Sequence, residues 1–326
     1  MNTETLDQPI VADVAVSAPA VVIESAAPAV AAVAEGPNPF IALGLDAALV
    51  RAVSDLGYTQ PTEVQAKAIP LAMGSGKADE ASIDLMVSSQ TGSGKTAAFL
   101  LPVLNTLIAQ KAIEAAAEQA EFERQRAQAA ASGEAAPKRA KRKNPMQSRN
   151  FKAAVPGALV LCPTRELAQQ VAQDAIELVK HCKNLRVANV VGGMPYQLQI
   201  AKLQNADLVV ATPGRLLDLQ RSLQIKLDKV QFLVVDEADR MLDLGFADDL
   251  EEVHQMTAQR KQTMMFSATF APRIQQLAMR VMHDGGANVQ KITIATPQQG
   301  HDNIQQKLYW ADHAQHKRKL LDHWLR

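Results

Sequence analysis

The sequence predicts an α/β protein in which a parallel β-sheet is flanked by helices. Short apolar runs alternate with helical stretches along most of the 326 residues, and this alternation is typical of parallel strands joined by crossover helices. Most of the runs are continuously apolar, as expected for strands covered on both faces. Hydrophobic residues make up 47% of the chain and aromatic residues only 4%, so we expect an aliphatic core.

The ordered part is expected to begin near Phe40, because Leu45–Leu56 carries apolar residues at helical spacing. Seven later segments have the length and apolar composition of buried strands. They are Asp84–Ser88, Ala158–Cys162, Val187–Val191, Asp207–Ala211, Phe232–Asp236, Thr263–Ser267 and Val289–Ile294. Together they predict one α/β domain over residues 37–295.

The N-terminal residues 1–36 differ in composition from the rest of the chain. They are rich in Ala, Val and Pro and contain five acidic residues but no Lys or Arg. A secretory signal needs a positively charged start, and transit peptides are rich in Arg. We therefore expect a disordered acidic tail rather than a targeting segment.

A second departure from the strand–helix pattern is a predicted insertion over residues 109–156. Asn105–Ala131 is rich in good helix formers, so the helix there is expected to continue past the core. Pro137–Lys152 then carries seven positive residues and no acid. Such a run is either a solvated loop or a nucleic-acid contact, and a nuclear signal has a similar composition.

A glycine-rich loop follows the first predicted strand and opens a helix. It reads Ser89-Gln90-Thr91-Gly92-Ser93-Gly94-Lys95-Thr96, which is the general phosphate-loop pattern with Ser89 in place of its first glycine. The two glycines let backbone N–H groups surround phosphate oxygens at the positive end of a helix. Lys95 is expected to reach the β- and γ-phosphates of a nucleotide, and the Thr96 hydroxyl to bind Mg²⁺.

A second GSGK sequence, Gly74–Lys77, lies nearby. It follows a helix-like stretch instead of a strand, and Ala78 stands where the metal-binding hydroxyl belongs. We interpret it as a surface loop.

The strand Phe232–Asp236 ends in a cluster of acidic residues. Its last carboxylate is expected near the phosphate loop, because the carboxyl ends of parallel strands share one edge of the sheet. Asp236 is then placed to hold Mg²⁺, and Glu237 to orient or deprotonate an attacking water.

Asp236-Glu237-Ala238-Asp239 spells DEAD, and from Phe40 to Ile294 the chain resembles the DEAD-box ATP-dependent RNA helicases of superfamily 2. The resemblance implies a RecA-like domain, ATP and Mg²⁺ as cofactors, and RNA as partner. Gly57–Gln65 resembles the Q motif of the family, in which Gln65 contacts the adenine edge and the upstream aromatic, here Phe40, packs on the base.

The remaining family motifs occur in order. They are Pro163-Thr164-Arg165 within motif Ia, Gly192-Gly193 as the GG element, Thr212-Pro213-Gly214-Arg215 as motif Ib, and Ser267-Ala268-Thr269 as motif III. The resemblance implies that the first three bind RNA and that motif III couples hydrolysis to RNA through the DEAD acids. Lys95, Asp236, Glu237, Asp239, Ser267 and Thr269 thus form the expected catalytic set.

The RNA-binding elements also make physical sense without the resemblance. Each follows a predicted strand, so all three are expected at the same edge of the sheet. Helix N-termini, free N–H groups and the charges of Arg165 and Arg215 suit RNA phosphates. Contacts of this type bind the backbone and carry no base-sequence information.

The chain departs from the family pattern at its C-terminal side. Ile304–Trp310 and Lys317–Leu325 look like the first strand and helix of a second RecA-like domain, which makes 296–326 a linker and domain start. Motifs IV to VI, with the arginine finger, would follow Arg326. We therefore expect residues 1–326 alone to be inactive in unwinding.

Two other classes of function remain open. The same motifs would serve an ATP-gated RNA clamp or scaffold that does not unwind, or a phosphate-loop protein acting on DNA or protein. Gln65 and Thr212–Arg215 argue against the last class. The net charge is zero, so RNA binding needs a local patch.

Composition also predicts where the protein works. The sequence contains no run of 18 apolar residues, so it predicts no segment that spans a membrane. Cys162 and Cys182 form no CxxC pair and fit a reducing compartment, so we expect a cytoplasmic protein. The seven histidines lack metal-ligand spacing and are expected at the surface.

Overall fold

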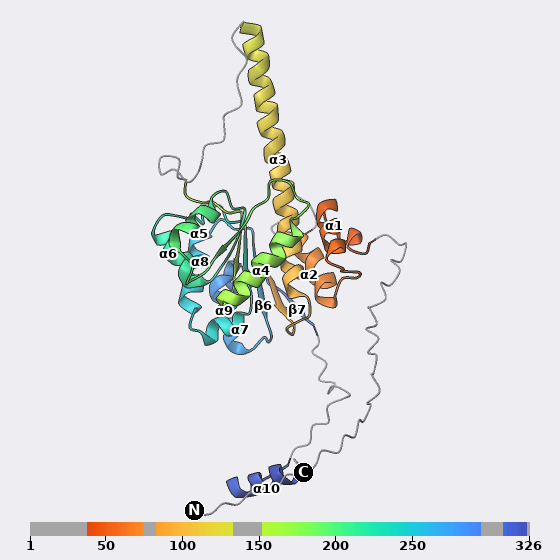
Figure 1. Cartoon of the computed structure of the whole chain (residues 1–326), viewed down its shortest axis with the longest axis vertical. Helices are drawn as coiled ribbons and strands as arrows, with labels where there is room; N and C mark the ends of the chain where they lie inside the picture. The colour runs from red at the N-terminus through yellow and green to blue at the C-terminus, as the bar shows by residue number, and fades with distance from the viewer. Residues whose placement is uncertain (1–37, 75–82, 133–151, 295–308, 325–326) are drawn as a thin grey trace, which may run out of the picture. The chain divides into compact units, whose positions relative to one another are not determined.

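A computed structural model describes residues 38–74, 83–132, 152–294 and 309–324. Its centre is a seven-stranded sheet in the order β3-β4-β2-β5-β6-β1-β7, and every strand pair is parallel (Figure 1). The strands are β1 Leu85–Ser88, β2 Ala158–Leu161, β3 Val187–Val190, β4 Leu208–Ala211, β5 Phe232–Val235, β6 Gln262–Ser267 and β7 Gln290–Thr293. All seven predicted strands and the α/β RecA-like class are confirmed.

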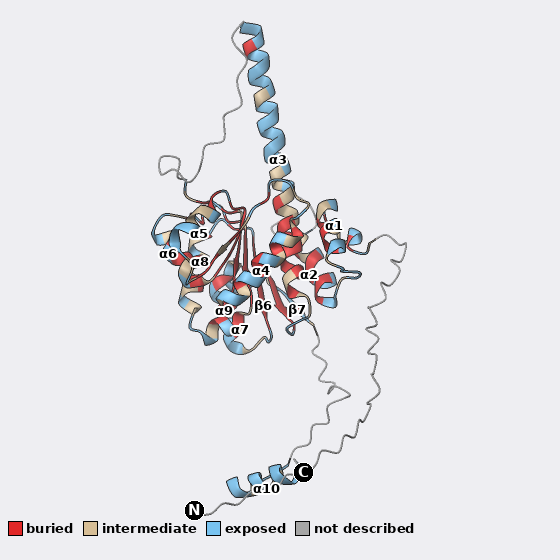
Figure 2. Ribbon diagram, viewed as in Figure 1, coloured by how far each residue is buried: buried red, intermediate tan, exposed pale blue. Residues whose placement is uncertain are grey.

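The central strands are buried on both faces, which explains why their sequences are continuously apolar. Leu85 and Val87 of β1 point into one core cluster, while Met86 between them points into a second cluster on the other face. Figure 2 shows the strands as a buried layer between helices that are exposed on their outer sides. The edge strand β7 buries Ile292 alone, because it has a neighbour on one side only.

Two layers of helices cover the sheet. The first layer contains η1 Ile41–Leu43, α1 Ala47–Asp55, α2 Glu63–Met73, α3 Lys95–Ser132 and α4 Arg165–Leu178. The second contains α5 Tyr196–Leu203, α6 Pro213–Arg221, α7 Ala238–Asp243, α8 Ala247–Met256 and α9 Pro272–Val281, with η3 at His283–Gly286. Most of these helices follow a strand directly, as the sequence pattern predicts.

The helix α3 is 38 residues long, which confirms the predicted extension beyond the core. Its buried side chains lie mainly between Lys95 and Leu107, and the remainder projects away from the sheet with its surface largely exposed (Figure 2). By length and composition, α3 is the one described helix that could cross a membrane. Half of its apolar window is buried inside the domain, so we interpret it as a core helix.

Several predicted segments fall outside the described residues. They are the acidic tail, most of the second GSGK sequence, nearly all of the basic segment and most of the strand expected at 304–310. The helix expected at Lys317–Leu325 is present as α10, Ala314–Trp324. The domain boundaries derived from the sequence stay predictions.

A polar network lies at the amino end of β1 and β6. The buried Asp84 accepts from the Thr263 amide at 2.6 Å and contacts the His283 ring at 3.0 Å. The Arg260 guanidinium lies 2.7 Å from both Thr263 Oγ1 and the Nδ1 atom of His254. The expectation that every histidine is a surface residue was wrong here, because His254 and His283 are partly buried by tertiary contacts that sequence spacing does not report.

Candidate functional site

Six motif-bearing loops line the carboxyl edge of the sheet. The spatial order is the GG element after β3, motif Ib after β4, motif Ia after β2, the DEAD acids after β5, motif III after β6 and the phosphate loop after β1. The elements expected to bind RNA therefore occupy one half of the edge. The elements expected to bind and hydrolyse ATP occupy the other half.

The phosphate loop has the backbone that its chemistry needs. Gly92 and Gly94 have φ angles of +79° and +90°, a region that residues with a side chain rarely adopt. The Lys95 ammonium donates to the carbonyl of Ser89 at 3.2 Å, so it lies folded against the loop. Gln90 and Thr91 are exposed, and Thr96 is partly exposed in the first turn of α3.

The side chain of Gln65 ties the Q motif to the phosphate loop. Its amide nitrogen donates to the carbonyl of Gly94 at 3.1 Å, and its amide oxygen accepts from the backbone N–H of Thr62 at 3.0 Å. The Thr62 hydroxyl accepts in return from the Gln65 N–H, which completes a capping box at the start of α2. A Cβ at Gly94 would lie 2.6 Å from the Gln65 amide nitrogen, and the φ of +90° also disfavours any residue with a side chain there.

The hydrogen bonds of the Gln65 side chain affect its predicted contact with the adenine base. Gln65 is buried and both ends of its amide are occupied, so reading an adenine edge requires these bonds to be exchanged. Phe40 is fully buried in the core, so its ring packs on protein side chains in this conformation. The roles of both residues toward a base stay predictions.

The DEAD acids differ sharply in environment. Asp236 is 3% exposed, and burial raises the pKa of its carboxyl to about 6, while the nearby Lys95 ammonium acts in the opposite direction. Glu237 has a left-handed backbone with φ of +48° at the start of α7, a strained position for a residue with a side chain. Its carboxylate lies 3.4 Å from the guanidinium of Arg240.

Motif III joins the DEAD acids to the phosphate-loop strand. The Ala268 N–H donates to the Asp239 carboxylate at 3.2 Å, and the Ser88 hydroxyl donates to the Ala268 carbonyl at 3.0 Å. The Ser89 N–H donates to the Ser267 carbonyl at 3.1 Å, and the Thr269 N–H lies 3.4 Å from the Ser267 hydroxyl. The structure thus links Asp239 to motif III through backbone atoms.

The GG element lies against motif Ia. The Arg165 guanidinium donates to the carbonyl of Gly192 at 3.4 Å. A Cβ at Gly193 would collide with the same guanidinium, and Gly193 also has a φ of +78°. The glycine pair therefore gives the arginine room to lie along the backbone.

Motifs Ia and Ib both start helices, but in different ways. The Thr164 hydroxyl caps α4 by accepting from the Leu167 N–H at 3.3 Å. Pro213 is the first residue of α6 after Thr212, and Gly214 is exposed. Pro163 directly precedes the Thr164 cap and lies outside α4, so the Thr164 hydroxyl caps the start of this helix.

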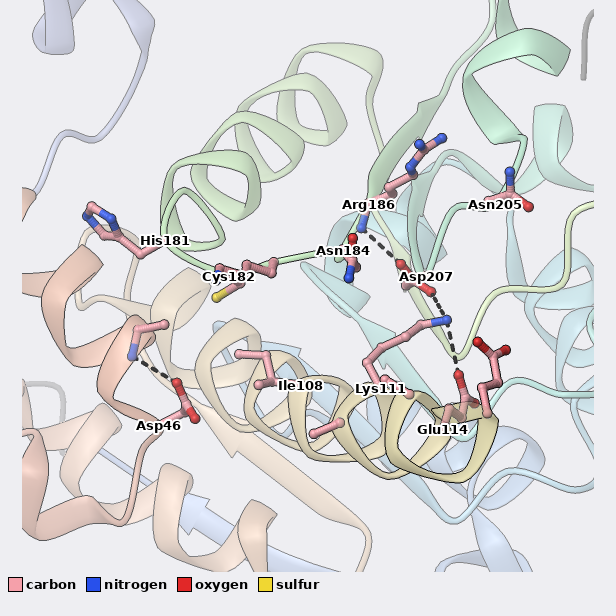
Figure 3. Close-up of a pocket in the computed structure, with 15 residues that line it drawn as sticks. Asp46, Ile108, Lys111, Glu114, His181, Cys182, Asn184, Arg186, Asn205 and Asp207 are labelled. Carbon is pink, nitrogen blue, oxygen red and sulfur yellow. Dashed lines mark hydrogen bonds and ion pairs between the residues drawn. The ribbon is translucent and has the colours of Figure 1, made fainter. Parts of the chain in front are cut away.

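A large cavity lies elsewhere. This open cleft of about 990 Å³ is bordered by α1, α3 and the segments before β3 and β4, at the amino end of these strands (Figure 3). Lys111 crosses it to bond Asp207 at 2.9 Å. Because amino and carboxyl ends of parallel strands lie on opposite edges, this cleft is separate from the six motif loops.

Sequence reasoning did not predict the local environment of three residues at the motif edge. The Thr62 cap was detectable, because Thr62 followed by Gln65 at the third position is a capping-box pattern. Cys162 is buried, and burial together with the charges of Asp236 and Glu237 raises the pKa of its thiol. Tyr196, which contacts Arg215, carries no signal of this role in the sequence.

Comparisons with known proteins agree with this geometry. The family model "DEAD/DEAH box helicase" matches residues 62–277. The chain is 39% identical to DEAD-box ATP-dependent RNA helicase 52A of Oryza sativa subsp. japonica, over 87% of this chain and 42% of that protein. It is 37% identical to ATP-dependent RNA helicase SrmB of Escherichia coli, over 88% of this chain and 54% of that protein.

Solved structures show the same fold. The yeast DEAD-box splicing factor Prp28 matches with a TM-score of 0.60 and 28% identity, over 86% of this chain and 56% of that one. A hypothetical ATP-dependent RNA helicase from Sulfolobus tokodaii matches with a TM-score of 0.56 and 32% identity, over 77% and 57%.

The ordered motifs on a RecA-like sheet define a helicase ATP-binding domain, and the chain belongs to the DEAD/DEAH box helicase family. It spans about half the length of the curated relatives it matches, 42% and 54% for the rice and Escherichia coli proteins.

Proposed function

We propose that this chain carries the ATP-binding loops and part of the RNA-binding surface of an ATP-dependent RNA helicase. The observation that carries the proposal is the order of the six loops along one sheet edge. Phosphate-binding and acidic groups occupy one half, backbone-binding groups the other, and Asp239 with motif III stands within the ATP half. Local RNA unwinding or remodelling driven by ATP is the activity that fits this layout.

The phosphate loop and Lys95 would bind the nucleotide. Backbone N–H groups around Gly92 and Gly94, with Gln90, Thr91 and Ser93 beside them, suit phosphate oxygens at the start of α3. Lys95 would exchange its bond to the Ser89 carbonyl for the β- and γ-phosphates.

Mg²⁺ fits the two predicted ligands. Asp236 is a nearly buried carboxylate whose raised pKa reflects the cost of burying a charge, and a divalent cation would favour its ionised form. Thr96 offers a hydroxyl from the first turn of α3. The metal would neutralise charge on the transferred phosphoryl group.

Glu237 is the candidate general base. Glu237 is the next residue after Asp236, the proposed metal ligand. Its left-handed backbone gives its side chain a different direction from that of a residue in a regular helix. In our proposal Glu237 orients or accepts the proton of the attacking water. In the same proposal, Asp239 couples nucleotide hydrolysis to motif III, Ser267-Ala268-Thr269, through its hydrogen bond from the Ala268 amide.

RNA would lie across the loops of β3, β4 and β2. Arg165 and Arg215 supply positive charge, Thr164 and Thr212 begin helices, and the glycines allow close approach. This surface is shaped by Pro163, Gly192, Gly193, Pro213 and Gly214.

We also propose a cytoplasmic location for the protein, because Cys162 and Cys182 are both unpaired and fit a reducing compartment.

The decisive experiment uses the full-length protein and compares ATP hydrolysis with RNA, with DNA of the same sequence and without nucleic acid. We expect stimulation by RNA alone. Glu237→Gln should retain ATP binding and lose at least 100-fold in turnover, about the contribution of one general base. Stimulation by DNA alone would contradict the proposal.

An ATP-gated RNA clamp is the second candidate, because the same loops would serve it. Duplex release separates the two. A helicase releases the strand repeatedly only when ATP can be cleaved, whereas a clamp holds RNA with an uncleavable analogue and releases no duplex with either nucleotide.

A further inference from the structure

Tyr196 is an aromatic residue at the motif edge whose role neither the motifs nor the family match assigns. It is the first residue of α5, three positions after Gly193 in the loop that follows β3. Its ring lies under the guanidinium of Arg215, which is 5.7 Å from the ring centroid. The loop after β3 thus contacts motif Ia through Gly192 and motif Ib through Tyr196.

The tyrosine is held at both ends. Its hydroxyl donates to Ser222 Oγ at 2.6 Å, and the Ser222 hydroxyl donates to the carbonyl of Asp218 at 2.6 Å. Arg215, Asp218 and Ser222 are spaced by three and four residues, so they share one face of α6 and its end. Tyr196 covers this face, with its hydroxyl at the end of α6 and its ring at the arginine.

This arrangement controls where the Arg215 charge is presented. The arginine side chain is only 19% exposed, because the ring covers part of it, and its Nε atom lies 3.9 Å from the Asp218 carboxylate. The guanidinium is thus held between the Tyr196 ring and the Asp218 carboxylate, and without the ring only the Asp218 side would hold it. An aromatic face stabilises a cation without neutralising it, so the charge stays available to a phosphate.

We propose that Tyr196 is a positioning residue that holds the Arg215 guanidinium at the RNA-facing edge of the sheet. The inference rests on the proposed function, since it deepens the role of motif Ib in binding the RNA backbone. Tyr196 acts through Arg215, and its hydroxyl serves only to anchor the ring to α6.

The test measures affinity of the full-length protein for a mixed-sequence single-stranded RNA, with an uncleavable ATP analogue, at several salt concentrations. Tyr196→Leu should weaken RNA binding about two- to fivefold, the value of an exposed cation–π contact. Tyr196→Phe keeps the ring and loses only its anchor to Ser222, so it should bind RNA more tightly than Tyr196→Leu and close to the wild type. ATP affinity should be unchanged in both, because the nucleotide loops occupy the other half of the edge.

A double-mutant cycle tests the coupling. Arg215→Ala should lower the log–log salt slope by about 0.7, and adding Tyr196→Leu should cause no further loss. Arg221→Ala is the matched control, because it removes one positive charge from the far end of α6 and should leave the affinity near wild type.

Two outcomes would overturn this proposal. Wild-type affinity for Tyr196→Leu would overturn it, as would losses for Tyr196→Leu and Arg215→Ala that multiply, since these mean that the ring contacts RNA directly. A wild-type protein that binds no RNA would instead reject the proposed function itself.

Discussion

At the scale of single residues, Lys95 and Lys77 offer a direct comparison, because both follow a GSG sequence. Only Lys95 is preceded by a strand and followed by a threonine, and its ammonium is folded into the phosphate loop. Lys95→Ala should abolish detectable ATP binding, measured by titration with a fluorescent nucleotide. Lys77→Ala should bind ATP normally, and equal losses in both variants would show that the loop assignment is wrong.

Gly193 gives a second prediction at this scale. Gly193→Ala places a Cβ against the Arg165 guanidinium and forces a positive φ on a residue with a side chain, which costs about 1–2 kcal/mol of stability. Displacing Arg165 should also weaken RNA binding, measured by fluorescence anisotropy. Gly245→Ala is the control, because Gly245 has a φ of +82° with open space around its Cβ position. It should show a similar stability loss with unchanged RNA affinity.

Among the elements, α2 is fastened to the phosphate loop through its first turn. Thr62→Ala removes the cap and costs about 1 kcal/mol of stability. The Gln65 side chain keeps its bonds to the Thr62 N–H and the Gly94 carbonyl, but the uncapped first turn holds it less firmly against the phosphate loop, so ATP affinity should fall as well. The α1 cap provides the comparison, since Asp46→Ala removes a similar bond to the Ala48 N–H. Thermal unfolding should detect both losses, while nucleotide titration should detect only the first.

His254, in the last turn of α8, makes the stability of the protein depend on pH. Burial, together with the Arg260 charge, lowers the pKa of His254 below its ordinary value. The unfolded state then binds more protons than the folded state as the pH falls below about 6.5, so stability decreases in that range. The Arg260 guanidinium faces His254 at 2.7 Å, with His283 and Glu251 as the other nearby titratable groups.

Replacing the ring tests this origin. His254→Gln cannot take up a proton, so its denaturant midpoint should change less between pH 7.5 and pH 5.5 than that of the wild type. His323→Gln, in the exposed part of α10, should retain the wild-type dependence. If the denaturant midpoint of His254→Gln falls as much as that of the wild type between pH 7.5 and pH 5.5, another titratable group causes the pH dependence.

For the whole molecule, the long helix α3 leads from the core into the basic segment Pro137–Lys152, most of which lies outside the described residues. We predict that this segment adds phosphate contacts to those of the sheet edge. Deleting it should leave basal ATPase activity and the melting temperature unchanged. RNA affinity should fall, and the log–log salt slope should decrease by about 0.7 for each lost contact. An unchanged slope would identify the segment as a solvated loop.

Much of this architecture follows from local sequence. Each phosphate-binding or acidic motif directly follows an apolar strand, and parallel strands bring their carboxyl ends to one edge whatever their order. The positions of Lys95, Asp236, Arg165 and Arg215 at that edge were therefore predictable. The length of α3 was also predictable, because good helix formers continue well beyond its apolar part.

Other features depend on residues that meet only when the chain is folded. The order of the strands separates the ATP half of the edge from the RNA half, and no local pattern encodes that order. Phe40 faces the core, Gln65 bonds the phosphate loop 29 residues away, and Tyr196 supports Arg215. Local sequence determined which chemical groups reach the site, because strand ends are set by short-range patterns. Long-range packing decided how these groups are held, because side-chain direction depends on neighbours that are distant in the chain.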